Sequence, residues 1–258
     1  MQFTFYKYHG TGNDFILADN RNGFFPKDDV ALISHLCKRH TGIGADGLIL
    51  LEEDIDSDFR MVYFNADGKE GSMCGNGGRC AVVFARKMGL IENTTIFSAV
   101  DGLHEAILEG NEVRLKMQDV DTIREKPEYL FLNTGSPHHV QMVDDLKSFD
   151  VQREGRRLRY GLYGKSGSNI NFVEESEQNK FSVRTYERGV ENETLSCGTG
   201  VTAVAISMHH LGHASANEVV VLTPGGQLVV TFEKENGRYT EINLKGPVKL
   251  VYKGSMEW

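Results

Sequence analysis

The sequence lacks the features that direct a chain to a membrane, to nucleic acid or to secretion. It contains no apolar run long enough to span a bilayer, and its first ten residues, MQFTFYKYHG, have no apolar signal-peptide core. It also has no long uninterrupted block of lysine and arginine, and its net charge is −8 at pH 7. We therefore expect a cytoplasmic protein that binds a small molecule rather than a membrane or a nucleic acid.

Cysteine is scarce as well, with four residues at positions 37, 74, 80 and 197. In a chain without a secretion signal, this number predicts reduced thiols rather than a disulfide framework. No Cys-x-x-Cys pair is present, and the spacing of Cys74 and Cys80 is not a usual zinc-ligand spacing. We expect no metal, and we interpret Cys37 and Cys80 as small buried residues.

One glycine-rich string, GIGADG at residues 42–47, matches the pattern of a dinucleotide-binding loop. That loop must follow a strand and open a helix. Here the string follows a helix-like stretch and precedes the strand-like LILLE. The order is inverted, so we expect no nucleotide cofactor.

The sequence is rich in glycine, with 28 residues, and it contains an internal repeat. Because glycine is so frequent, a single glycine match between the two halves means little. One offset of 123 residues, however, also superimposes Cys74 on Cys197 and aligns the surrounding strand, turn and helix patterns. The glycines matched by this offset are Gly12 with Gly135, Gly44 with Gly167, Gly75 with Gly198, Gly77 with Gly200, Gly89 with Gly212, and Gly102 with Gly225.

Each half of the repeat reads as an alternating strand, a turn, and an apolar helix that ends at a glycine. Both helices are apolar on more than one face, so we expect sheet around each of them. The sequence predicts an α+β fold of two pseudo-symmetric domains, each a mostly antiparallel curled sheet or barrel around a central helix. We expect the domains at residues 1–118 and 119–248, with residues 249–258 completing the first.

Cys74 and Cys197 each precede a Gly-x-Gly at a predicted helix start. Unpaired N–H groups and the helix dipole lower the pKa of a thiol at that position, which suits a general base. Glycine also lets a ligand carboxylate approach the backbone N–H groups closely. If the two halves face each other, two thiols would flank one α-carbon and invert it, while the N–H groups stabilise the carbanion.

Six strings resemble, in order, the signature segments of diaminopimelate epimerases: KYHGTGNDF, FNADG, MCGNGGRC, GSPHHV, YERG and SCGTG. The resemblance implies that LL- and meso-2,6-diaminoheptanedioate are interconverted without pyridoxal phosphate or metal, in lysine and peptidoglycan precursor synthesis. It also implies a homodimer.

The resemblance assigns roles to residues of this chain as well. Cys74 and Cys197 would be the acid/base pair, and His138 would tune a thiol or position the substrate. Glu187 would lie near an ammonium group. The reacting carboxylate would be held by Gly75, Asn76, Gly198 and Thr199, and the distal end by Asn13, Asn65, Asn169 and Arg188. Of His138 and His139, only one can face the site from an extended segment.

The chain departs from the family pattern at three places. The family often has Gln at the position of Gly47 and Asn at that of Ser136, and this chain has one extra residue between YERG and Cys197. Three alternative functions stay open: a proline or hydroxyproline racemase-like enzyme, a non-catalytic amino-acid-binding protein of the same fold, and a thiol-based redox sensor. The first would not need the distal carboxylate ligands Arg188 and Asn169.

Overall fold

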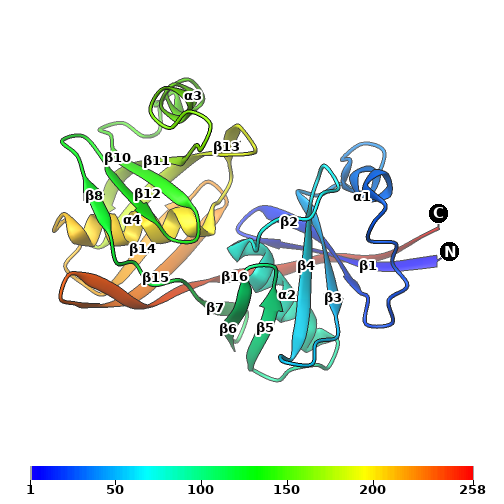
Figure 1. The fold of residues 1–258 in the computed structure, drawn as a ribbon. Helices are drawn as coiled ribbons and strands as arrows, with labels where there is room; N and C mark the ends of the chain where they lie inside the picture. Colours follow the sequence, from blue (N-terminus) through cyan, green and yellow to red (C-terminus); the bar gives the residue numbers. More distant parts are fainter. Residues whose placement is uncertain (1, 258) are drawn as a thin grey trace. The chain divides into compact units, whose positions relative to one another are not determined.

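The computed structural model describes residues 2–257. The chain divides into two compact units, one running to Leu115 and including the segment from Gly246 onward, the other spanning Lys116–Lys245. Each unit is a curled sheet with a helix inside it (Figure 1). No helix within residues 2–257 is long and apolar enough to cross a membrane.

The first unit is an eight-stranded barrel. Its strands lie in the order β1-β2-β3-β4-β5-β6-β7-β16, and β1 pairs with β16 to close the ring. The elements are β1 (Gln2–Gly10), β2 (Asn13–Asp19), α1 (Val30–Cys37), β3 (Gly47–Glu52), β4 (Phe59–Asn65), α2 (Gly75–Lys87), β5 (Thr94–Ala99), β6 (Gly102–Glu109), β7 (Glu112–Lys116) and the second part of β16 (Arg238–Glu257).

The second unit repeats this arrangement with its strands in the order β16-β15-β14-β12-β11-β10-β9-β8, and β13 pairs with β12. The elements are β8 (Ile123–Glu125), β9 (Leu130–Asn133), β10 (Pro137–Met142), α3 (Val151–Gly161), β11 (Asn169–Glu177), β12 (Lys180–Glu187), β13 (Asn192–Thr194), α4 (Gly198–His210), β14 (Glu218–Thr223), β15 (Gly226–Glu235) and the first part of β16.

Four strand pairs within residues 2–257 are parallel, and in each of them a helix lies between the two strands in the chain, because parallel neighbours need a long crossover. In the first unit α1 connects β2 to β3 and α2 connects β4 to β5. In the second unit α3 connects β10 to β11 and α4 connects β12 to β14. Most of the remaining pairs, such as β1–β2, β5–β6, β11–β12 and β14–β15, are antiparallel, which confirms the predicted α+β class.

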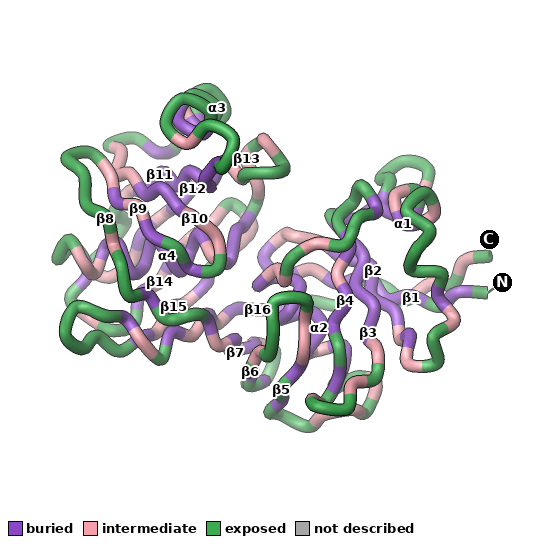
Figure 2. Tube along the Cα trace, viewed as in Figure 1, coloured by how far each residue is buried: buried purple, intermediate pink, exposed green. Residues whose placement is uncertain are grey.

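The central helices α2 and α4 have 13 residues each. Their first residues are separated in the sequence by the repeat offset, and so are their last residues. Each ends before a glycine with a left-handed backbone, Gly89 with φ 75° and Gly212 with φ 81°. Helix α4 is buried from Val201 to Met208 and contacts six strands of its unit (Figure 2). Burial on all sides explains why α4 has no polar face in its sequence, whereas α2 ends in the exposed residues Arg86 and Lys87.

Candidate active site

Cys74 and Cys197 are the N-cap residues of α2 and α4, as the sequence predicts. Both have extended backbones, with φ −105° and −122°, and neither sulfur caps its own helix. An α-helix provides no intrahelical acceptor for its first N–H groups, and these groups carry the positive end of the dipole. Each cysteine therefore lies beside a helix start whose N–H groups carry a partial positive charge.

In the first unit, Asn13 connects Cys74 to the rest of the site. The Oδ1 atom of Asn13 accepts hydrogen bonds from Cys74 Sγ at 3.5 Å and from Asn76 Nδ2 at 3.2 Å. Its Nδ2 atom donates to Asp46 Oδ2 at 2.7 Å. Because a carboxylate only accepts, Asp46 fixes the orientation of the Asn13 amide and turns its oxygen toward the sulfur.

Asp46 belongs to a larger charge network around β2. Arg39 donates to Asp46 Oδ1 at 2.6 Å and to Asp14 Oδ1 at 2.8 Å, and Lys7 forms an ion pair with Asp14 at 2.7 Å. The hydrogen bonds and charges of Arg39 and Lys7 outweigh burial and lower the pKa of Asp14 to about 2. This network holds in place the carboxylate that orients Asn13.

Arg79 lies behind the Cys74 half-site and was not predicted. It is 0% exposed, and its Nη2 atom donates to Asn76 Oδ1 at 2.9 Å and to Thr11 Oγ1 at 3.3 Å. None of the carboxylates in residues 2–257 forms an ion pair with it. Burial lowers the pKa of Arg79, and the charges of Cys80 and Cys74 oppose that shift. A charged residue in the first turns of a buried helix is the signal by which the sequence could have revealed it.

The Cys197 half-site is built differently. The His138 side chain is 0% exposed, and its Nε2 atom lies 2.9 Å from Thr199 Oγ1, which in turn lies 3.5 Å from Cys197 Sγ. Burial, helped by the charge of Arg188, lowers the pKa of His138 to about 3. His138 is therefore neutral at neutral pH, and Thr199 Oγ1 lies between its ring and the sulfur of Cys197.

His139 points away from α4, as expected for neighbouring residues of a strand. Its Nδ1 atom contacts Tyr163 Oη at 2.9 Å, and its ring stacks on Tyr129 with centroids 4.2 Å apart. Burial lowers its pKa to about 4. Of the two histidines, only His138 belongs to the candidate site.

The remaining predicted residues of the second unit lie together at the ends of β11 and β12. Asn169 Oδ1 accepts a hydrogen bond from the backbone N–H of Arg188 at 2.8 Å. The Arg188 side chain is exposed and donates to the Ser166 carbonyl at 2.9 Å. Thr194 Oγ1 donates to Glu187 Oε2 at 2.9 Å. One cation, one carboxylate and one amide are thus grouped in a single unit.

The side chain of Tyr63 explains why position 47 is a glycine. A Cβ atom at position 47 would lie 2.5 Å from Tyr63 Cε2, 3.0 Å from Tyr63 Oη and 2.5 Å from the Phe64 carbonyl oxygen. Tyr63 is half-buried and precedes Asn65 on the same face of β4, and Asn65 is the strand partner of Gly47. The phenol ring therefore occupies the space that a side chain at position 47 would take.

Cys37 and Cys80 are buried free thiols, as predicted. Burial raises the pKa of Cys37 to about 12 and raises that of Cys80 further. At neutral pH both remain protonated and unreactive.

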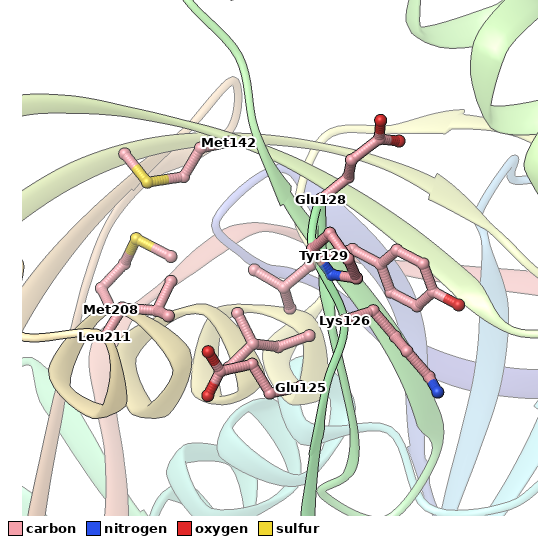
Figure 3. A pocket seen from close by; sticks show the side chains of 10 residues that line it. Glu125, Lys126, Glu128, Tyr129, Met142, Met208 and Leu211 are labelled. Carbon is pink, nitrogen blue, oxygen red and sulfur yellow. The ribbon is translucent and has the colours of Figure 1, made fainter.

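A cavity of about 560 Å³ lies elsewhere in the second unit (Figure 3). It is lined by the β8–β9 turn, by Val140 and Met142, and by Met208 and Leu211 near the C-terminal end of α4. Cys197 is at the opposite end of this 13-residue helix, about 20 Å away at 1.5 Å per residue. The cavity is therefore separate from the candidate active site.

Comparison with known proteins shows the family of the chain. The family model described as Diaminopimelate epimerase matches residues 5–122 and 130–251. The chain is 55% identical over 249 residues to the diaminopimelate epimerase of Flavobacterium psychrophilum, covering 96% of this chain and 97% of that protein. It is 43% identical over 258 residues to that of Chlorobaculum tepidum, covering 96% and 98%.

Solved structures share the fold at low sequence identity. A PhzF-family phenazine biosynthesis protein of Bacillus anthracis aligns with TM-score 0.80 and 14% identity over 100% of both chains. A hydroxyproline epimerase of Agrobacterium vitis aligns with TM-score 0.70 and 15% identity, covering 99% of this chain and 92% of that chain. These likenesses concern the fold alone, whereas the family match and the full-length relatives show that the chain belongs to the diaminopimelate epimerase family.

Proposed function

We propose that this protein interconverts LL- and meso-2,6-diaminoheptanedioate by a two-base mechanism in which Cys74 and Cys197 are the acid/base pair. The observation that carries the proposal is that the two cysteines occupy the N-cap positions of two equivalent helices in a chain 55% identical to a diaminopimelate epimerase. The proposal requires both sulfurs to reach opposite faces of one α-carbon.

In the reaction, the thiolate of one cysteine removes the α-proton and becomes a thiol. The other cysteine, a thiol, donates its proton to the opposite face of the carbanion and becomes a thiolate. Configuration at the α-carbon is inverted and the enzyme's total proton count is unchanged. The thiolate and thiol have exchanged places, so the reverse reaction uses the same groups in opposite roles.

The difficult species is the carbanion, whose charge spreads onto the carboxylate oxygens. The helix-start N–H groups favour this charge, and preorganised donors of this kind contribute several kcal/mol to transition-state stabilisation. We assign the reacting carboxylate to the helix starts at Gly75, Asn76, Gly198 and Thr199. In our proposal, no metal or organic cofactor takes part.

We assign the distal end of the substrate to Asn13, Asn65, Asn169 and Arg188. Arg188 offers a planar fork that can bind a carboxylate with two hydrogen bonds, and its side chain is exposed. Glu187 would attract an ammonium group. A proline-like substrate has no distal carboxylate, so Arg188 favours the dicarboxylate. The racemase-like neighbours support the alternative only through their shared fold.

Incubation of the reduced protein with LL-diaminopimelate in D2O tests the function. We expect deuterium at the α-carbon and formation of the meso isomer. If neither the deuterium nor the meso isomer appears, and deuterium is instead exchanged into proline, the proposed substrate is wrong. A redox sensor or a non-catalytic binding protein would exchange deuterium into neither diaminopimelate nor proline.

The proposal extends to the cellular setting. We place the protein in the cytoplasm, in lysine and peptidoglycan precursor synthesis, and as a homodimer. Light scattering at assay concentration tests the dimer, and a monomer with full activity would remove that part of the proposal.

A further inference from the structure

The strands beneath the two central helices carry different chemistry at equivalent positions. Gly77 and Gly200 occupy the same place in α2 and α4. The three atoms nearest to a Cβ at Gly77 would be side-chain carbon atoms of Ile49, Met61 and Phe15, whereas a Cβ at Gly200 would lie 2.6 Å from Asn171 Oδ1. The strand pairing of the two units shows which residues are equivalent. Phe15, Ile49 and Tyr63 of the first unit are apolar or aromatic, and their counterparts in the second unit are the polar residues His138, Asn171 and Thr185.

Asn171 is 0% exposed and its amide has only one possible orientation. Its Nδ2 atom donates to the carbonyl oxygen of His139 at 2.8 Å, and a carbonyl can only accept. Its Oδ1 atom accepts from Thr185 Oγ1 at 2.9 Å. The second hydrogen of Nδ2 therefore faces His138 Nδ1, at 3.2 Å.

This orientation selects the tautomer of His138. Since Nδ1 accepts from Asn171, the single proton of the neutral ring is on Nε2, which donates to Thr199 Oγ1 at 2.9 Å. Asn169 Nδ2 also faces Nε2, but at 3.5 Å it is at the limit of a hydrogen bond. Because the Thr199 hydroxyl oxygen accepts the hydrogen bond from His138, its own proton is directed to Cys197 Sγ at 3.5 Å.

We propose that Asn171 is a positioning residue that, through His138 and Thr199, directs a hydroxyl donor at the sulfur and stabilises the thiolate of Cys197. A hydrogen bond donated to the charged form of a group favours that form. The role of the thiolate in catalysis rests on the proposed function, but the hydrogen-bond chain does not. Cys74 Sγ differs in that it donates to an acceptor, Asn13 Oδ1, at 3.5 Å.

Among the described residues, Arg188 is the charged group whose field lowers the pKa of His138, and Glu187 precedes it at the end of β12. Glu187 accepts from Thr194, and the Arg188 side chain donates to Ser166. Low pKa values keep His138 and His139 neutral, so neither adds charge at neutral pH. The donor from Thr199 is therefore the feature to be tested.

The test measures the pH dependence of iodoacetamide alkylation at Cys197 and at Cys74 separately, by mass spectrometry of their peptides in the intact protein. Asn171→Ile, which copies Ile49, and Thr199→Val should each raise the midpoint for Cys197 by about one pH unit. The double variant should show no further shift, because both changes remove the same donor. The Cys74 midpoint should stay unchanged. Additive shifts, or equal shifts at both cysteines, would overturn the proposal.

A second measurement does not require the Asn171 variant to fold. Nitrogen NMR of the wild-type protein labelled in histidine, with His138→Gln to assign the signal, reports which ring nitrogen carries the proton. We expect Nε2–H, and an Nδ1–H ring would refute the mechanism. Neither measurement uses catalysis, so wild-type protein that fails to exchange deuterium into diaminopimelate would refute the proposed function alone.

Discussion

Asn13 Oδ1 lies 3.5 Å from Cys74 Sγ and is held there by the Asp46 carboxylate at 2.7 Å from Asn13 Nδ2. The Asn13 amide is thus oriented before any substrate arrives. In our proposal it contacts both an acid/base cysteine and the distal end of the substrate. This double role leads to the first prediction.

Asn13→Ala should reduce kcat/KM for LL-diaminopimelate by at least about tenfold, equivalent to about 1.4 kcal/mol of transition-state stabilisation. Asn20→Ala serves as the matched control, because Asn20 is a buried amide bonded to Glu52 and Phe25 away from the cysteines. Steady-state kinetics of both variants decide the matter, and equal losses would show that Asn13 acts only through folding.

Arg79→Met should raise the pKa of the Cys74 thiol, because it removes a buried positive charge near the thiolate. Arg79→Lys should retain part of the effect. The matched control is Thr202→Val at the equivalent position of α4, where the native hydroxyl donates to the Gly198 carbonyl at 3.0 Å. Alkylation of Cys74 as a function of pH gives the result, and an unchanged midpoint in Arg79→Met would exclude an electrostatic role.

Gly47→Ala should destabilise the first unit by about 1–3 kcal/mol through overpacking. The added methyl group would meet the Phe64 carbonyl oxygen and the Tyr63 ring, both at 2.5 Å. Gly161→Ala is the control, since a Cβ there has nothing within 4 Å and its φ is not positive. Urea denaturation distinguishes the two, and equal stability of both variants would show that Tyr63 does not restrict position 47.

Acid should destabilise the second unit through its buried histidines. In the folded state the pKa values of His138 and His139 are about 3 and about 4, below the ordinary value of 6.5. The unfolded chain therefore binds protons that the folded chain cannot, and stability present above about pH 6.5 is lost progressively down to these lower values.

Urea midpoints between pH 7 and pH 4 measure this loss. His139→Phe, which removes one titrating ring but keeps a flat side chain against Tyr129, should give a shallower decline than the wild type. A parallel decline in the two proteins would mean that His139 does not take up a proton on unfolding.

Much of the fold could be predicted because the repeated strand and helix patterns, and the glycines that end the helices, are local signals. The apolar runs of α2 and α4, and the stops at Gly89 and Gly212, depend on neighbouring residues and are visible in the sequence. The placement of Cys74 and Cys197 as N-caps follows from the same pattern.

Contacts between distant strands could not be predicted in this way. Asn171 reads as one residue of a strand, and its role depends on the parallel pairing of β10 with β11, which places it beside His138 and beneath Gly200. The fit of Tyr63 over Gly47 likewise depends on the register of β3 and β4. Such registers are set by tertiary packing rather than by local propensity.

The most direct test of the central claim is the epimerisation rate of Cys74→Ala and of Cys197→Ala, measured with LL-diaminopimelate alongside circular dichroism to establish folding. A two-base mechanism predicts that each folded variant loses epimerisation, because one face of the α-carbon then has no proton donor or acceptor. Full activity in either folded variant would contradict it.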